Sequence, residues 1–152
     1  MSMIQQDYIL RMVQMMGEMI LVAMRLKKAG SFAEADETLS DALLGIVPDH
    51  ADLIEMVDER TAVSLLGDVR LVDAYVELLL ERAELKVILD REIEGDEIQR
   101  RAIRIFLGKF RRTGELTPNG QLLLGRISGL ELNLLLEPEE LEELNNMGRI
   151  TA

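Results

Sequence analysis

Residues 19–43, with the sequence MILVAMRLKKAGSFAEADETLSDAL, decide the fold of this chain. Apolar residues recur at steps of three and four on both sides of Gly30, and this spacing places them on one face of a helix. Gly30 suits a tight turn, and Ser31 with Glu34 three residues later forms the capping box that begins a helix. The stretch therefore predicts two helices joined by a short turn.

The same spacing continues along the chain, and we predict an all-α fold in one compact domain of residues 1–152. The aromatic fraction is only 3%, there are three prolines, and no stretch of alternating residues competes with the helical pattern. We expect about seven helices, at residues 4–29, 31 to near Pro48, 49–66, 69–92, 96–112, 117–136 and 138–144. Residues 146–152 are expected to fray at the terminus.

Two segments resemble tetratricopeptide repeats. The better match consists of Met19, Val22, Ala23, Leu26, Gly30, Phe32, Ala35, Leu39, Ala42 and Pro48, with the proline one residue late and Met19 in place of a large aromatic residue. Gly95, Asp96, Ala102, Phe106 and Phe110 resemble the second half of another repeat, with two extra residues between the glycine and the alanine. Regular arrays keep a fixed 34-residue period. The resemblance therefore implies antiparallel tetratricopeptide-like helix pairs and not a regular solenoid.

The opening residues 3–12 and the turn at residues 30–35 also resemble the start of a family of small bacterial helical proteins of unknown function. This resemblance implies a bacterial origin and a fold. It implies no activity.

Composition limits the function classes. The chain has no cysteine and a single histidine, His50, beside Pro48 in a predicted turn, so we expect no metal and no cofactor. The first ten residues lack the pattern of a secretory signal, and the apolar run at residues 19–24 is far shorter than the roughly 20 residues of a membrane span. We expect a cytoplasmic protein without membrane contact.

No enzyme active site is recognisable. The acidic run at residues 139–143 is typical of a solvated helix face, and His50 has no neighbouring ligand in a Glu-x-x-His pattern. The 28 acidic residues leave open an enzyme that uses carboxylates alone. A cleft that holds two or more buried acids would favour this alternative. The leading hypothesis is a non-enzymatic interaction or scaffold module.

A basic segment at residues 100–112 contains no acidic residue, although the net charge of the chain is −11. Its cations have three interpretations: pairing with acids of the same assembly, such as residues 137–143, docking of an acidic partner, or binding of nucleic acid. The net charge and the lack of stacking aromatic residues make nucleic acid the least favoured partner. The candidate docking residues are Arg100, Arg101, Arg104, Lys109, Arg111 and Arg112.

Apolar residues are also unevenly distributed. Seven of the nine methionines lie in the first 24 residues, and leucines surround most of the predicted helix at 117–136. Methionine occurs both as core filler and at adaptable binding surfaces. We therefore predict a homo-oligomer, with a dimer favoured, and an unidentified protein partner remains open. The candidate interface residues are Met12, Met16, Ile20, Met24, Leu123, Ile127, Leu130 and Leu134.

Overall fold

The computed structural model describes residues 3–46 and 51–151, and within these residues it is all-helical, with nine helices and no strand. This confirms the predicted all-α class. The helices are α1 (Met3–Lys28), α2 (Phe32–Ile46), α3 (Ala51–Met56), α4 (Glu59–Leu66), α5 (Val69–Ile88), α6 (Glu92–Thr113), α7 (Pro118–Ser128), α8 (Leu132–Leu135) and α9 (Pro138–Thr151). His50 and Pro48 lie outside the described residues.

The additional helices arise because two predicted helices are each divided. Asp58 interrupts the segment predicted at 49–66, since its side chain accepts a 2.7 Å hydrogen bond from the Thr61 amide and caps α4. The segment predicted at 117–136 ends as α7 at Ser128, where Gly129 is the C-cap, and resumes only as the short α8. The prediction of seven helices was therefore too coarse at both positions.

The C-terminal helix is longer than predicted. Helix α9 continues to Thr151, whereas we expected a helix over residues 138–144. Leu141, Leu144 and Met147 recur every three residues, and the side chains of Leu144 and Met147 are buried in the core. Because burial of this apolar face is favourable, it holds the terminal helix against the domain.

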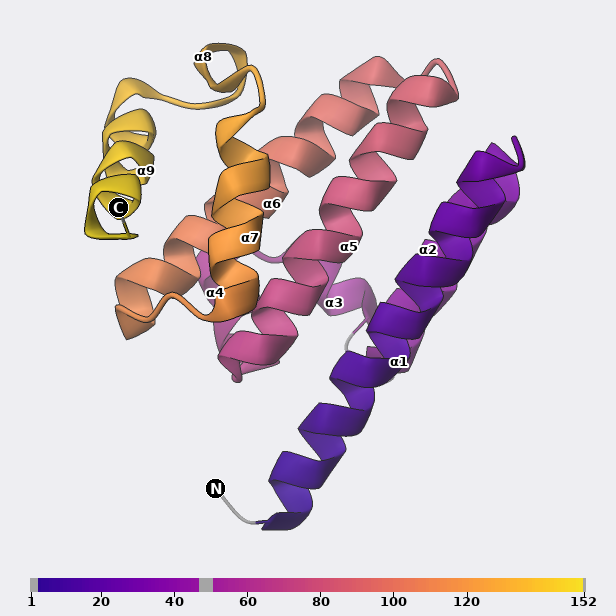
Figure 1. Cartoon of the computed structure of the whole chain (residues 1–152), viewed down its shortest axis with the longest axis horizontal. Helices are drawn as coiled ribbons and strands as arrows, with labels where there is room; N and C mark the ends of the chain where they lie inside the picture. Colours follow the sequence, from indigo (N-terminus) through magenta and orange to yellow (C-terminus); the bar gives the residue numbers. More distant parts are fainter. Residues whose placement is uncertain (1–2, 47–50, 152) are drawn as a thin grey trace.

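Two helix pairs form the body of the fold (Figure 1). Helices α1 and α2 pack along one another, as do α5 and α6, and α5 also contacts both helices of the first pair. Gly30 forms the first turn with a φ of +82°, a left-handed conformation that glycine adopts without strain. Gly95 allows α6 to approach α5, since a Cβ at this position would lie 3.0 Å from the carbonyl oxygen of Ala83.

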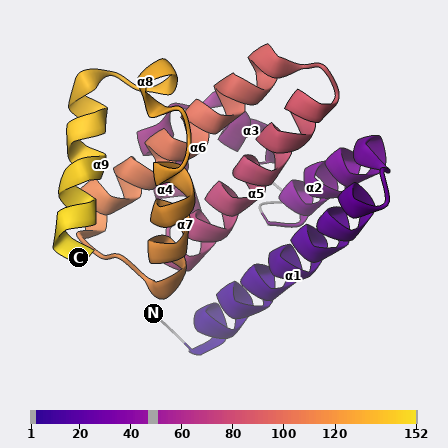
Figure 2. The same cartoon turned by 45° about the horizontal axis from the view of Figure 1, so that its top comes forward.

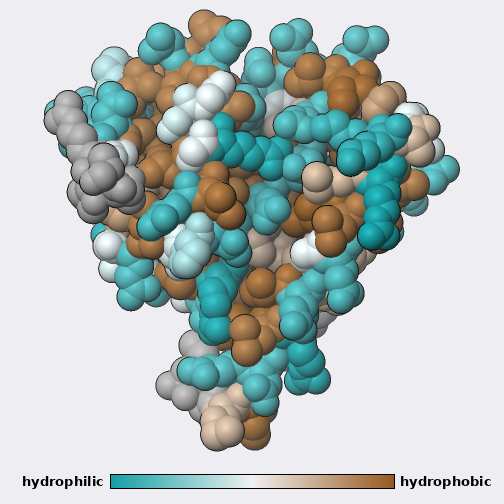
Figure 3. Space-filling view, in the orientation of Figure 1, coloured by the Kyte–Doolittle hydropathy of each residue, from teal (hydrophilic) through white to brown (hydrophobic). Residues whose placement is uncertain are grey.

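Helices α4, α7, α8 and α9 gather on the side of α5 and α6 that lies away from α1, whereas α3 contacts α2 and α4. Helix α4 packs on α6, α7 contacts α5, and α9 contacts α6, α7 and α8. Figure 2 places α9 and α1 at opposite edges of the molecule, and the N-terminal part of α1 extends past the other helices. Along that part of α1 the surface carries hydrophobic side chains between hydrophilic ones (Figure 3). Among the described residues, no helix has both the length and the apolar character of a membrane span.

Candidate functional site

Helix α6 carries all six candidate cations, and two of them bind the ends of short helices. Arg100 Nε donates to the Leu135 carbonyl oxygen at 2.7 Å, at the last residue of α8. Arg101 donates to the carbonyl oxygens of Ile54 and Val57, at the end of α3. The last carbonyls of a helix have no intrahelical donor and carry a partial negative charge. These two arginines therefore cap α8 and α3.

Two further arginines of α6 pair with the acidic face of α9. Arg104 donates to both carboxylate oxygens of Glu140 at 2.9 and 3.2 Å, and Arg111 donates to both oxygens of Glu143 at 2.6 Å. Such two-point contacts between guanidinium and carboxylate fix geometry as well as charge. This is the pairing with residues 137–143 that the sequence allowed.

The pairing shifts the pKa of Arg104, Arg111 and Glu140. Partial burial acts to raise the pKa of Glu140, but hydrogen bonds from Arg104 and from the Glu137 amide, with the charge of Arg104, lower it below its ordinary value. Hydrogen bonds with Glu140 and Glu143 raise the pKa of Arg104 and Arg111, respectively. These shifts favour the charged forms of Glu140, Arg104 and Arg111.

Lys109 does not belong to any docking surface. Its side chain is 0% exposed, its ammonium pairs with the buried Asp73 of α5, and it lies 4.6 Å from the ring centroid of Phe106. The second oxygen of Asp73 accepts a 2.7 Å hydrogen bond from Thr117 Oγ1, which in turn caps α7 by accepting from the Gly120 amide. The prediction that Lys109 contacts a partner was wrong, because this residue joins α5, α6 and α7 inside the core.

A cleft of about 600 Å³ lies where α4, α6 and α9 meet. Four arginines line it: Arg60 from α4 and Arg104, Arg111 and Arg112 from α6. Arg112 donates to Ser64 Oγ at 3.1 Å, and in the described parts of the chain neither Arg112 nor Arg60 forms an ion pair with a carboxylate. Val63 and Gly108 also line the cleft, together with the acidic side chains of Asp58, Glu59 and Glu140, so it combines apolar contact surface with four arginines and three carboxylates.

The predicted interface residues separate into two groups. Met12, Met16, Ile20, Leu123 and Ile127 are buried in the core of the single chain, and Met16 is 0% exposed. Their assignment to an interface was wrong, since the chain's own helices already cover them. Leu130 is partly buried against the same core, whereas Met24 and Leu134 are exposed.

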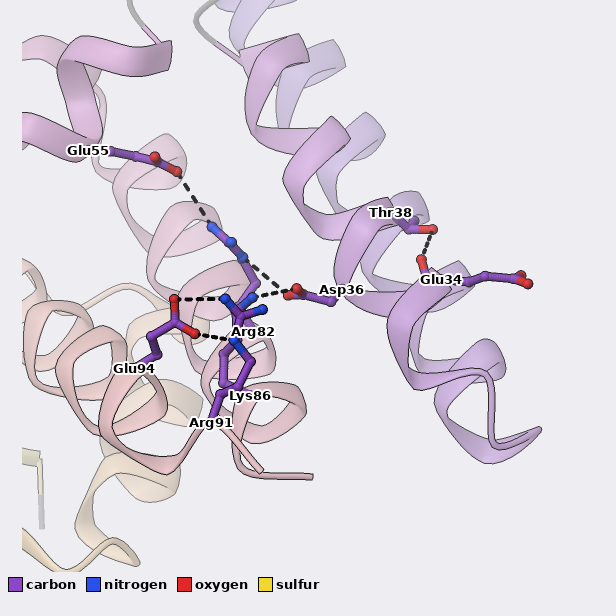
Figure 4. Close-up of polar contacts among 8 residues, drawn as sticks. All are labelled: Glu34, Asp36, Thr38, Glu55, Arg82, Lys86, Arg91 and Glu94. Atoms are coloured by element: carbon purple, nitrogen blue, oxygen red, sulfur yellow. Dashed lines mark hydrogen bonds and ion pairs between the residues drawn. The ribbon is translucent and has the colours of Figure 1, made fainter. Parts of the chain in front are cut away.

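A second polar network links the first helix pair to α5 (Figure 4). Lys86 Nζ lies 2.6 Å from Asp36 Oδ2 of α2, and Arg82 reaches both Asp36 and Glu55 of α3 at 3.5 Å. The sequence offered a signal for this network, because Arg82 and Lys86 are four residues apart within a helix that is otherwise largely apolar.

The buried acids lie away from the cleft. Among the described residues the buried acids are Asp73 and Glu81, which pair with Lys109 and Arg126 and do not line the cleft. No group of three or more His, Asp or Glu side chains suited to a metal ion occurs in the described parts of the chain. No protein-family model, curated protein or solved structure matches the chain.

Proposed function

We propose that this protein is a non-enzymatic helical interaction module that docks an acidic protein segment in the cleft between α4, α6 and α9. The observation that carries the proposal is the pair Arg60 and Arg112, which line this cleft and form no direct ion pair among the described residues, although Asp58 and Glu59 also line it. Arginine presents a planar fork of donors that matches a carboxylate, and it is the cation best suited to interface ion pairs.

Helix α9 provides an internal example of the chemistry. Its Glu140 and Glu143 lie three residues apart, so they share one helix face and reach Arg104 and Arg111 together. A partner helix with carboxylates at the same spacing would engage Arg60 and Arg112 in the same manner. The net charge of −11 disfavours nucleic acid more than a short acidic protein segment. A phosphate backbone carries dense negative charge along its length, so it is repelled by the rest of the surface.

The arrangement of the helices supports the same class of function. Ala23, Ala35 and Ala42 are buried in the pair α1–α2, as expected for closely packed tetratricopeptide-like helices, and such pairs commonly present binding surfaces. A cytoplasmic location fits a chain without cysteine. A carboxylate-only enzyme is less favoured, because the buried acids are neutralised by cations.

The test is a titration of a labelled helical peptide with glutamates at i and i+3, followed by fluorescence anisotropy. Arg60→Ser with Arg112→Ser should weaken binding at least tenfold without lowering the melting temperature, since both side chains lie at the surface of the cleft. The matched control is Arg91→Ser, an exposed arginine of the segment before α6 that pairs only locally with Glu94. It should leave binding unchanged.

Salt and competing ligands make the outcome decisive. Binding should weaken as ionic strength rises past about 0.15 M, where the screening length falls to about 8 Å. Equal affinity of wild type and the double variant would refute the cleft as the site. Sub-micromolar binding of duplex DNA or RNA at 0.15 M salt would replace the acidic partner with nucleic acid.

A further inference from the structure

Helix α1 has an apolar side that no other described helix covers. Leu10, Leu21 and Met24 are 45%, 53% and 40% exposed. At about 100° per residue they lie within about 60° of one another, on a flank turned about 110° from the buried Met16. Figures 1 and 2 show α1 at the edge of the fold, with α2 and α5 on its other sides. From Leu10 to Met24 this side is about 21 Å long, because an α-helix rises about 1.5 Å per residue.

Gly17 lies at the centre of this side. A Cβ added to Gly17 would meet nothing within 4 Å, so no contact within the chain accounts for a glycine at this position. Glycine is among the least favourable residues in a helix interior, and its use there often marks close approach of another backbone. Gly95 has this role between α5 and α6, where the approaching backbone belongs to the same chain.

The apolar residues are arranged symmetrically about Gly17. Leu10 precedes it by seven residues and Met24 follows it by seven, while Val13 and Leu21 lie four residues away on either side. If a second α1 crosses antiparallel at Gly17, Leu10 therefore meets the partner's Met24 and Val13 meets the partner's Leu21. A surface hollow lined by Asp7, Leu10, Arg11 and Gln14 lies beside the position that the partner's Met24 would occupy.

Charge on the flank of this side distinguishes the two helix directions. Asp7 and Arg25 are both exposed, and neither forms an ion pair within the described residues. They are 18 residues apart, which is five full helical turns, so they lie on the same flank. Asp7 lies ten residues before Gly17 and Arg25 eight residues after it, so an antiparallel partner brings the partner's Arg25 within two residues of Asp7 on the same flank, and the two-fold axis repeats this pair. In a parallel dimer the two copies of this flank lie on opposite sides of the helix pair, so the attractive contact does not form.

We propose that the protein forms a symmetric dimer in which two α1 helices cross antiparallel at Gly17, with Asp7 paired to the partner's Arg25. The occupant of this surface is a second copy of the chain, because the apolar residues and the charges both complement themselves under a two-fold axis. The surface lies apart from the arginine cleft and does not depend on the acidic partner.

The first experiment replaces Gly17 by leucine and measures mass by sedimentation equilibrium. Gly17→Leu should raise the dimer dissociation constant at least tenfold, because the larger side chain keeps the two backbones apart. It should leave the helix content unchanged, since the side chain points into open space in the single chain. Gly125→Leu is the matched control, as Gly125 is also a helical glycine, in α7, with nothing within 4 Å of an added Cβ.

The second experiment reverses the flanking charges. Asp7→Arg and Arg25→Asp should each weaken the dimer severalfold, and the doubly substituted chain should recover the wild-type dissociation constant. An equimolar mixture of the two single variants should form a heterodimer in which both pairs are attractive.

Three results would overturn the proposal. A monomeric wild type at tens of micromolar would assign the apolar side to another occupant. A dimer unaffected by Gly17→Leu would place the interface elsewhere. Single charge reversals without effect would exclude the antiparallel arrangement.

Discussion

The buried pair of Asp73 and Lys109 should behave as one energetic unit. Both side chains are almost fully buried, and they join α5 to α6 and, through Thr117, to the start of α7. Removing one partner of such a pair leaves a buried charge without compensation and costs about 3–5 kcal/mol. For a domain of this size each kcal/mol lowers the melting temperature by about 2–4 °C, so each single variant should melt about 6–20 °C lower.

The variants are Asp73→Leu, Lys109→Met and their combination, with unfolding in urea followed by circular dichroism. The double variant should cost less than either single variant, because two apolar side chains of similar volume leave no charge to desolvate. Arg91→Met is the control, since the exposed pair with Glu94 is worth about 0–1 kcal/mol. Additive costs in the double variant would refute the reasoning, as would a cost below about 1 kcal/mol for Lys109→Met alone.

Three further predictions concern α9, α1 and metal ions. The pKa of Glu140 is lowered in the folded state, so its pairing with Arg104 stabilises α9 above the ordinary glutamate pKa of about 4.5, and this stabilisation is lost as the pH falls through the lowered pKa. Amide exchange in α9 of the wild type should therefore increase in this acidic range. The Glu140→Gln variant should not show this pH-dependent increase. Met16→Lys should unfold the protein, whereas Met24→Lys should change the free energy of unfolding by less than about 1 kcal/mol and weaken the dimer, as denaturant unfolding and sedimentation together would show. A chelator should leave the thermal melt unchanged, because the chain has no cysteine and one histidine; a lowered melt would contradict this.

The fold class was predictable because the helical spacing of apolar residues is repeated throughout the chain. Helix ends were less predictable, since a single residue decides whether a helix continues or stops. Asp58 and Gly129 each carried a known signal for a break, but both lie within longer apolar patterns that favour continuation. The length of α9 was readable in Leu144 and Met147, whose spacing continues the apolar face of this helix.

The contacts of the basic segment at residues 100–112 were only partly predictable. Pairing of Arg104 and Arg111 with α9 involves acidic side chains that the sequence displays. The partners of Arg100 and Arg101 are main-chain carbonyls at helix ends, which exist only once the fold has formed. Burial of Lys109 depends on Asp73, 36 residues away, and no local pattern relates the two.

The separation of the two proposed surfaces has a consequence for binding strength. Figures 1 and 2 place α1 at one edge of the molecule and α9 at the opposite edge, so a dimer formed through α1 leaves both arginine clefts accessible. A partner with two acidic segments on a flexible linker could then occupy both clefts, and such linkage can raise apparent affinity by about 10²–10⁴ without any new contact. The monomeric Gly17→Leu chain would retain the affinity of one cleft and lose this gain. Dimerisation through α1 would therefore serve docking at the clefts, although the two surfaces share no residue.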